Sequence, residues 1–147
     1  MGNRYVLFSL GKVKYALKLE NVVQILRYEN VMEVPKAPKF VIGVINLRGE
    51  VFPVINMWER FGLPAEELTK KNRIIVVRYE DRTFGLLVKE VKEITELEEE
   101  EIEREVTSVY GLRGCFIEGI AKMGEGLIII LNIKEIIESD EDIHIAK

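Results

Sequence analysis

The stretch "FVIGVINLRGEVFPVINMWERF", residues 40–61, contains the pattern that decides the fold. Branched and aromatic residues fill the runs 40–47 and 51–56, which is typical of β-strands. Gly49 lies between the runs, where a tight turn needs a residue that tolerates a positive φ. Asn56 then precedes "MWERF", as expected of the residue that caps a helix. The stretch therefore predicts a β-hairpin followed by a short helix.

This pattern occurs twice. Residues 116–137, "FIEGIAKMGEGLIIILNIKEII", align with residues 40–61, so that Gly43 matches Gly119 and Asn56 matches Asn132. Residues 15–25 similarly align with residues 84–94, and the second copy carries an insertion between about 95 and 115. A repeat of this kind indicates two similar β units in tandem. Because each unit is too small to bury a large core, we expect the two to pack as one domain, 1–147.

Further segments share the composition of strands, and their turns contain Gly or Asp. The predicted strands are 4–10, 13–19, 40–47, 51–56, 73–79, 83–88, 116–123 and 126–133. They divide into approximate subdomains 15–70 and 73–137, with the terminal segments completing each unit. Short helices are expected near Asn21, Asn56 and Asn132. The acidic stretch 89–105 reads as a solvated helix or loop. Pro53 indicates that its strand is at an edge or bulged.

Composition excludes several partners. The chain has 147 residues, of which 48% are hydrophobic and 31% charged, a balance typical of globular proteins. A net charge of −4 gives no basic field for nucleic acid. The apolar runs are too short to span a bilayer, and the first residues do not form a signal peptide. We therefore expect a cytoplasmic protein without membrane insertion.

The sequence also lacks the usual parts of an active site. His144, the only histidine, lies close to the C-terminus, so we expect neither a histidine-based catalytic site nor a metal site. Cys115 has no histidine to activate it and is expected to be a small buried residue. No phosphate-binding loop or dinucleotide fingerprint is present. We predict no catalytic residues, no metal and no cofactor.

Asn46 and Arg48 are not explained by the repeat. Their counterparts in the second copy are Lys122 and Gly124, so a hairpin can form without them. One interpretation is a functional turn. The other is that Arg48 forms a surface ion pair with Glu50 or Glu59, which would contribute little.

Residues 40–62 resemble the signature of the CheW family of chemotaxis coupling proteins. The shared features are a Phe, a Gly three residues later, Asn-Leu-Arg-Gly at 46–49 and Pro-Val at 53–54. The opening "YVLFSLGKVKYALKLENVVQIL" is similar to the first hairpin of the family, and "LIIILNIKEII" to its closing strand and helix. The resemblance covers almost the whole chain.

The resemblance implies a mainly β fold of two five-stranded barrels of the Src-homology-3 kind, packed on each other. It also implies an adaptor that joins the cytoplasmic tip of a chemoreceptor to the regulatory domain of the kinase CheA, recruited to membrane-bound receptor arrays. Receptor binding is carried over to Asn46 and Arg48, with Leu19 and Val22 as apolar residues of the same groove. An apolar floor with a few polar anchors suits a helical partner.

The kinase contact is predicted from positions that are apolar in one copy only. Ile42 matches Glu118, and Trp58 matches Lys134. Both could be exposed apolar residues that bind the kinase, or they could lie at the seam between the two halves.

Two other interpretations stay open. The chain could be a CheW-like regulatory module of a CheA or CheV protein, although no kinase or receiver segment accompanies it. It could also be a small β-barrel enzyme or ligand carrier, which the lack of a usable histidine disfavours.

Overall fold

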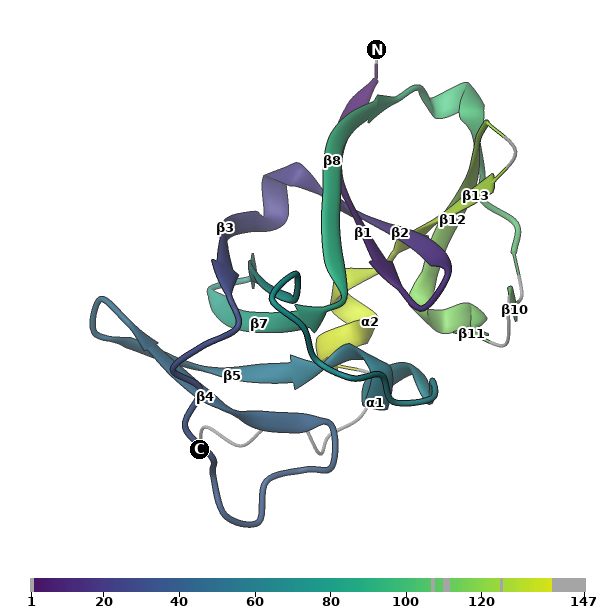
Figure 1. The fold of residues 1–147 in the computed structure, drawn as a ribbon. Coiled ribbons are helices and arrows are strands. Elements are labelled where there is room, and N and C mark those ends of the chain that lie inside the picture. Colours follow the sequence, from purple (N-terminus) through teal and green to yellow (C-terminus); the bar gives the residue numbers. More distant parts are fainter. Residues whose placement is uncertain (1, 107, 110–111, 125, 139–147) are drawn as a thin grey trace.

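The computed structural model describes residues 2–106, 108–109, 112–124 and 126–138; His144 lies outside them. The strands are β1 (Asn3–Leu10), β2 (Val13–Lys18), β3 (Val22–Arg27), β4 (Val41–Leu47), β5 (Glu50–Asn56), β6 (Arg73–Tyr79), β7 (Arg82–Val88), β8 (Glu90–Leu97), β9 (Ile102–Glu103), β10 (Ser108–Val109), β11 (Leu112–Arg113), β12 (Ile117–Met123) and β13 (Gly126–Leu131). The helices are α1 (Met57–Phe61), α2 (Ile133–Glu138) and the 3-10 turns η1 (Leu19–Asn21), η2 (Glu99–Glu101) and η3 (Gly114–Phe116). The prediction of a mainly β fold with short helices is confirmed (Figure 1).

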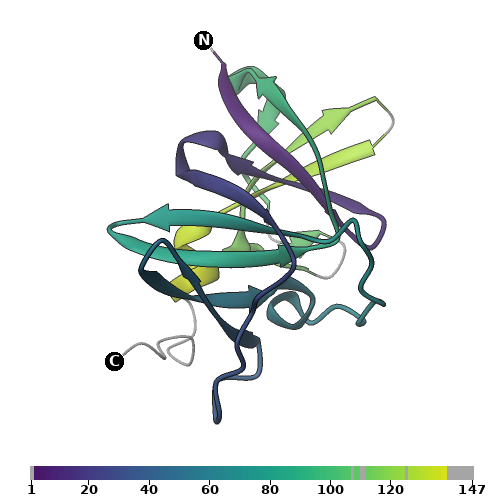
Figure 2. The ribbon, with the colours of Figure 1, turned by 60° about the vertical axis from the view of Figure 1, so that its left-hand side comes forward.

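Two sheets exchange their first hairpins. The larger sheet has the order β8-β1-β2-β13-β12-β9, and the smaller one β3-β6-β7-β5-β4. The β1–β2 hairpin thus lies beside strands of the second repeat, and the β6–β7 hairpin beside strands of the first (Figure 2). The expected division at residues 70–73 therefore does not describe how the strands are shared. The reason is that β2 pairs in parallel with β13, and β7 with β5.

The strand registers follow the repeat. Ala16 pairs with Ile130 in one sheet, and Gly85 with Val54, the equivalent positions, in the other. Val6 opposite Ile94 and Ile75 opposite Ile25 form a second equivalent set. The two sheets are therefore built by one pairing scheme used twice.

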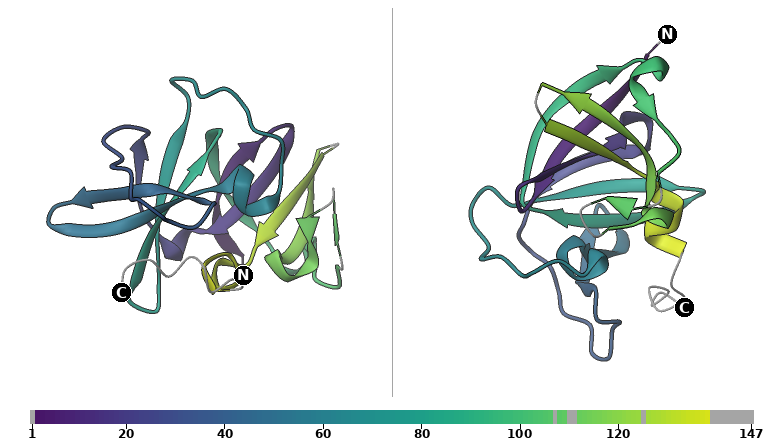
Figure 3. Two further views of the ribbon diagram at one scale, coloured as in Figure 1. Left: turned by 90° about the horizontal axis from the view of Figure 1, so that it is seen from below. Right: turned by 90° about the vertical axis from the view of Figure 1, so that its right-hand side faces the viewer.

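Short segments bridge the open edges of each sheet. Met32, which follows β3, exchanges two hydrogen bonds of 2.8 Å with Val44 on β4. In the larger sheet, β9 follows β8 and η2 and pairs with β12. The predicted five-stranded barrels thus appear as two curled sheets, one of five strands and one of six (Figure 3). Closure is short in each: one residue pair, Met32 with Val44, in the smaller sheet, and two pairs between β9 and β12 in the larger.

The helices sit where the two halves meet. Asn56 caps α1 by accepting a hydrogen bond from the Glu59 amide, and Asn132 accepts one from the Glu135 amide at the start of α2, both at 3.2 Å. Arg60 of α1 is buried and donates from Nε to the Ile136 carbonyl at 2.8 Å. A second bond from Nη2 to the Glu135 carbonyl, at 3.2 Å, adds to this contact, and a cation near the C-terminal part of a helix is favoured by the helix dipole.

One core runs through both halves. Val6 and Phe8 of β1 pack in the large cluster that includes the smaller sheet, while Tyr5 and Leu7 point into the larger sheet's own interior. Burial on both faces of β1 gives its near-continuous apolar sequence a physical reason. The exchanged hairpin is therefore a central layer between the two halves.

Two local predictions were wrong. A strand, β3, starts directly after η1, so the helix expected near Asn21 is only a 3-10 turn. The branched residues of "VVQIL" favour an extended strand, and their burial alternates with period two. The acidic stretch 89–105 is not a helix or loop throughout. Residues 90–97 form the edge strand β8, which supplies the backbone hydrogen-bonding partners that β1 needs on that side.

Two single residues also differ from expectation or refine it. Cys115 is exposed in η3, where the expectation was burial. Pro53 lies in β5, which has neighbours on both sides, but the pairing with β7 begins only at Val54. Pro53 is thus at a local edge of the sheet, where the strand pairing does not require an amide hydrogen.

Candidate functional site

The turn at residues 46–49 contains two polar residues, Asn46 and Arg48, of which only Asn46 stabilises the turn. Leu47 pairs with Glu50, and Arg48 and Gly49 have φ values of 53° and 89°, as in a type I′ turn. Asn46 Oδ1 accepts a hydrogen bond of 3.0 Å from the Gly49 amide. Asn46 therefore holds the turn, whereas Arg48 occupies a conformation that disfavours a side chain.

Arg48 does not form either of the ion pairs considered above. Glu50 instead receives Arg78 at 3.0 Å and the Thr83 hydroxyl at 2.7 Å, while Glu59 has Lys39 within 4.0 Å. The Arg48 side chain is exposed and makes no ion pair within the described part of the chain. The interpretation of Arg48 as part of a surface pair is wrong.

Leu19 and Val22 lie at the same end of the smaller sheet as this turn. Both are half-buried and pack on the large core, at η1 and the start of β3. Between them, Asn21 Nδ2 donates to the Arg78 carbonyl at 3.4 Å, and the Arg78 side chain reaches Glu50 beside the turn. Arg78 therefore links Asn21, beside Leu19 and Val22, to Glu50, beside the turn, but the structure does not place the four predicted receptor-binding residues around a single hollow.

A groove opens beside η1. It has a volume of about 280 Å³ and is lined by Lys18, Asn21, Tyr79, Glu118, Leu131, Asn132, Ile133 and Lys134. Lys18 Nζ lies 3.4 Å from Glu118 Oε1 across it. Leu131 and Ile133 are buried beneath. We call this the charged groove.

Ile42 and Trp58 are brought together in a second hollow. This apolar hollow, of about 220 Å³, is lined by Tyr28, Ile42, Asn56, Trp58, Glu59, Leu63, Ala65, Glu66, Leu68 and Leu87. Ile42 is half-buried, but Trp58 is only 4% exposed. Trp58 is therefore a wall of the hollow and not an exposed contact residue.

Glu66 ties the loop after α1 to three other segments. Its Oε2 accepts hydrogen bonds from Trp58 Nε1 and the Gly11 amide, each at 2.7 Å, and its Oε1 lies 3.2 Å from Lys89 Nζ. The hydrogen bond from Trp58 contributes most to lowering the pKa of Glu66, and Lys89 and Gly11 add to it against the opposing effect of burial.

Sequence reasoning missed Glu66 and Arg60. Nothing in the sequence marks Glu66 among so many acids. Arg60 could have been found, because its counterpart in the second copy is the buried Ile136, and an apolar match indicates a core position. The same comparison does single out Ile42 and Trp58.

The described residues offer no centre for metal chemistry and no membrane segment. Residues 2–106, 108–109, 112–124 and 126–138 contain no group of three or more His, Cys, Asp or Glu side chains placed to hold a metal. Within the same residues, no helix is long and apolar enough to span a bilayer.

Comparison with known proteins relates the chain to one family. The profile of the CheW-like domain matches residues 4–141. The chain is 32% identical to the chemotaxis protein CheW of Helicobacter pylori, over 93% of this chain and 82% of that protein. It is 34% identical to the chemotaxis protein CheW of Thermotoga maritima, over 89% of this chain and 85% of that protein. The crystal structure of the scaffolding protein TtCheW from Thermoanaerobacter tengcongensis superposes with a TM-score of 0.87 at 34% identity, covering 94% of this chain and 89% of that one.

Proposed function

The chain belongs to the family of CheW-like domains, and from that premise we propose that it couples chemoreceptors to the histidine kinase CheA. Its relatives include several chemotaxis proteins, and one solved relative is a scaffolding protein, so the chain is a chemotaxis adaptor and not an enzyme. In the proposed role it works in the cytoplasm and is recruited to receptor arrays. One surface binds the cytoplasmic tip of a receptor and another binds the regulatory domain of the kinase.

Arg48 is the observation that carries the receptor assignment. The backbone of Arg48 has a φ of 53°, a conformation that costs stability for any residue with a side chain but not for glycine. The equivalent residue in the second copy is Gly124. Arg48 nevertheless presents all its donors to solvent without an ion pair among the described residues. A strained, exposed cation that the hairpin does not need fits a role in binding a partner.

The other receptor-binding residues have supporting parts. Asn46 fixes the direction of the Arg48 backbone through its bond to Gly49. Leu19 and Val22 supply half-buried apolar surface at the same end of the sheet. A helical receptor tip would pack on these two residues and place a carboxylate or backbone carbonyls against Arg48.

The kinase is proposed to dock at the apolar hollow. The half-buried Ile42 is the accessible apolar residue of this hollow, while the buried Trp58 forms part of its wall. Leu63 and Leu68, in the loop after α1, line the same hollow and add apolar surface. This arrangement suits an apolar side chain of the partner.

Arg48→Ala is expected to weaken receptor binding while the fold stays intact. The loss of a charge-assisted contact in a partly desolvated site should cost about 1.5–3 kcal/mol, or roughly ten- to a hundredfold in affinity. Calorimetric titration with a receptor-tip fragment measures this, and a parallel titration with the kinase regulatory domain should show no change.

Two further variants make the test specific. Arg48→Gly removes the guanidinium and also the strain, so its melting temperature should equal or exceed that of the wild type while its affinity falls. Arg4→Ala removes another exposed arginine, on β1, and should leave receptor binding unchanged. Unchanged affinity in both Arg48 variants would refute the assigned role, and a melting temperature that falls with the affinity would place Arg48 in the scaffold.

A further inference from the structure

The charged groove and the apolar hollow occupy equivalent places in the two copies of the repeat. Their lining residues match one to one at four positions: Leu87 and Lys18, Ile42 and Glu118, Asn56 and Asn132, Trp58 and Lys134. The two asparagines cap their helices in both copies. The other three positions are apolar in one hollow and charged in the other, so the same backbone frame presents two different chemistries.

The charges of the groove are arranged around Glu118. Lys18 lies 3.4 Å from the Glu118 carboxylate, and Arg104 approaches it at 3.8 Å from outside the groove. The exposed Lys134, at the start of α2, also lines the groove and forms no ion pair with any described residue. Glu118 is thus already neutralised, and the groove carries an excess of positive charge.

This excess contrasts with the chain as a whole, whose net charge is −4. A locally positive groove in an acidic protein favours an acidic partner segment and disfavours a basic one. The buried Leu131 and Ile133 beneath the charges provide an apolar floor. Recognition would therefore combine one carboxylate with a neighbouring apolar side chain.

We propose that the charged groove selects a helical segment of the receptor tip that carries a carboxylate beside an apolar residue, with Lys134 as its main partner and Lys18 as the second. The assignment to the receptor rests on the proposed function. It follows from continuity, because Asn21 of the groove wall lies between Leu19 and Val22. In the proposed function, the equivalent apolar hollow of the first copy binds the kinase.

The test uses Lys134→Glu in the full chain and a receptor-tip fragment as the probe. Reversal of the charge should weaken binding roughly three- to tenfold at low salt, and the difference from wild type should shrink as salt is added. A fragment in which the pairing carboxylate is replaced by lysine should bind Lys134→Glu better than it binds the wild type.

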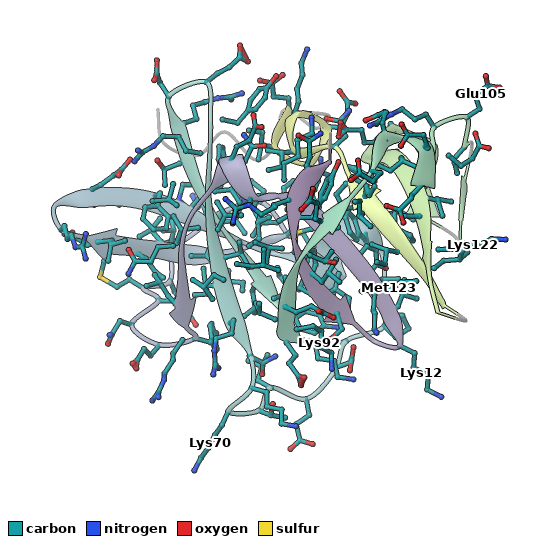
Figure 4. All side chains as sticks on the ribbon, turned by 90° about the horizontal axis from the view of Figure 1, so that it is seen from above. Lys12, Lys70, Lys92, Glu105, Lys122 and Met123 are labelled. Carbon is teal, nitrogen blue, oxygen red and sulfur yellow. The ribbon has the colours of Figure 1, made fainter. Side chains whose placement is uncertain are left out.

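Lys122→Glu is the matched control. It makes the same change of charge on β12, about 13 Å further along the strand from Glu118. Lys122 projects from the edge of the molecule in Figure 4 and lines neither hollow. Its affinity for the fragment should stay within twofold of the wild type, and both variants should melt like the wild type.

The outcomes separate this inference from the proposed function. Equal effects of Lys134→Glu and Lys122→Glu overturn the inference, as does a loss confined to binding of the kinase domain. If Arg48→Ala weakens receptor binding while Lys134→Glu does not, only the inference fails. If neither variant changes receptor binding, the receptor site itself is wrong.

Discussion

At the scale of single residues, the polar side chains of the β4–β5 turn and of the two hollows differ in function, and their contacts show which of them the fold uses. Asn46 and Glu50 stabilise the fold. Asn46 accepts a hydrogen bond from the Gly49 amide, and Glu50 binds Arg78 and Thr83. Glu66 is a clasp, because one carboxylate joins the β1–β2 turn, α1 and the end of β7. Arg48 and Lys134 make no ion pair with any described residue. Lack of an ion pair alone does not select them, since the exposed Arg4 and Lys122 make none with the described residues either; Arg48 is assigned to a partner for its positive φ and Lys134 for its place in the groove.

Acidification should open the Glu66 clasp. Because the pKa of Glu66 is lower in the folded chain than in an unfolded one, its stabilising contribution is present above the unfolded pKa and is lost as pH falls through the folded pKa. Trp58 is the only tryptophan and bonds to Glu66, so its emission spectrum should shift over this acidic range. Glu66→Gln is the control, and it should lack the transition; the same transition in this variant would show that another group titrates.

At the scale of elements, the repeated glycines of β4 and β12 allow a crossing segment to close each sheet. A Cβ atom on Gly43 would lie 2.1 Å from the Met32 carbonyl oxygen, and one on Gly119 would lie 2.6 Å from the Ile102 side chain. The first obstacle is a backbone carbonyl, whereas the second is the Cγ2 methyl group of a side chain, with the Glu103 carbonyl oxygen farther away at 3.1 Å. The two glycines thus serve the same purpose with different tolerance.

Gly43→Ala should therefore cost more stability than Gly119→Ala. We expect about 3 kcal/mol or more for the first, since the Met32–Val44 bridge must open, and about 1 kcal/mol for the second. Urea denaturation of the two variants and the wild type measures the difference. Equal losses of stability would contradict the account of sheet closure.

At the scale of the whole molecule, the exchange of hairpins makes the two repeats interdependent. Each sheet takes two strands from one repeat and the remaining strands from the other. The helices add a further link, because Arg60 of α1 donates to carbonyls of α2. A rigid relation between the two hollows follows, which suits an adaptor that must hold two partners in a fixed geometry.

Residues 1–70 expressed alone should not fold. Their β1–β2 hairpin would lack β8 and β13, and their β3 and β5 would lack β6 and β7. Circular dichroism should show no cooperative melting for this fragment or for residues 71–147 alone. An equimolar mixture should recover a cooperative transition, because the fragments together contain every strand. A sharp transition in either fragment by itself would contradict the interdependence.

The sequence by itself determined the local structure: the hairpin at 40–56, the caps at Asn56 and Asn132, the repeat and the resemblance to one family. These features depend on neighbouring residues, whose periodicity and turn chemistry can be read along the chain. Only the tertiary structure decided that the hairpins are exchanged, that Trp58 is a buried wall, and that Lys18, Glu118 and Lys134 share one groove. The physical reason is that the two hairpins pair in equivalent registers, so the repeated sequence indicates the register but not the sheet, and the choice of sheet depends on packing between distant segments.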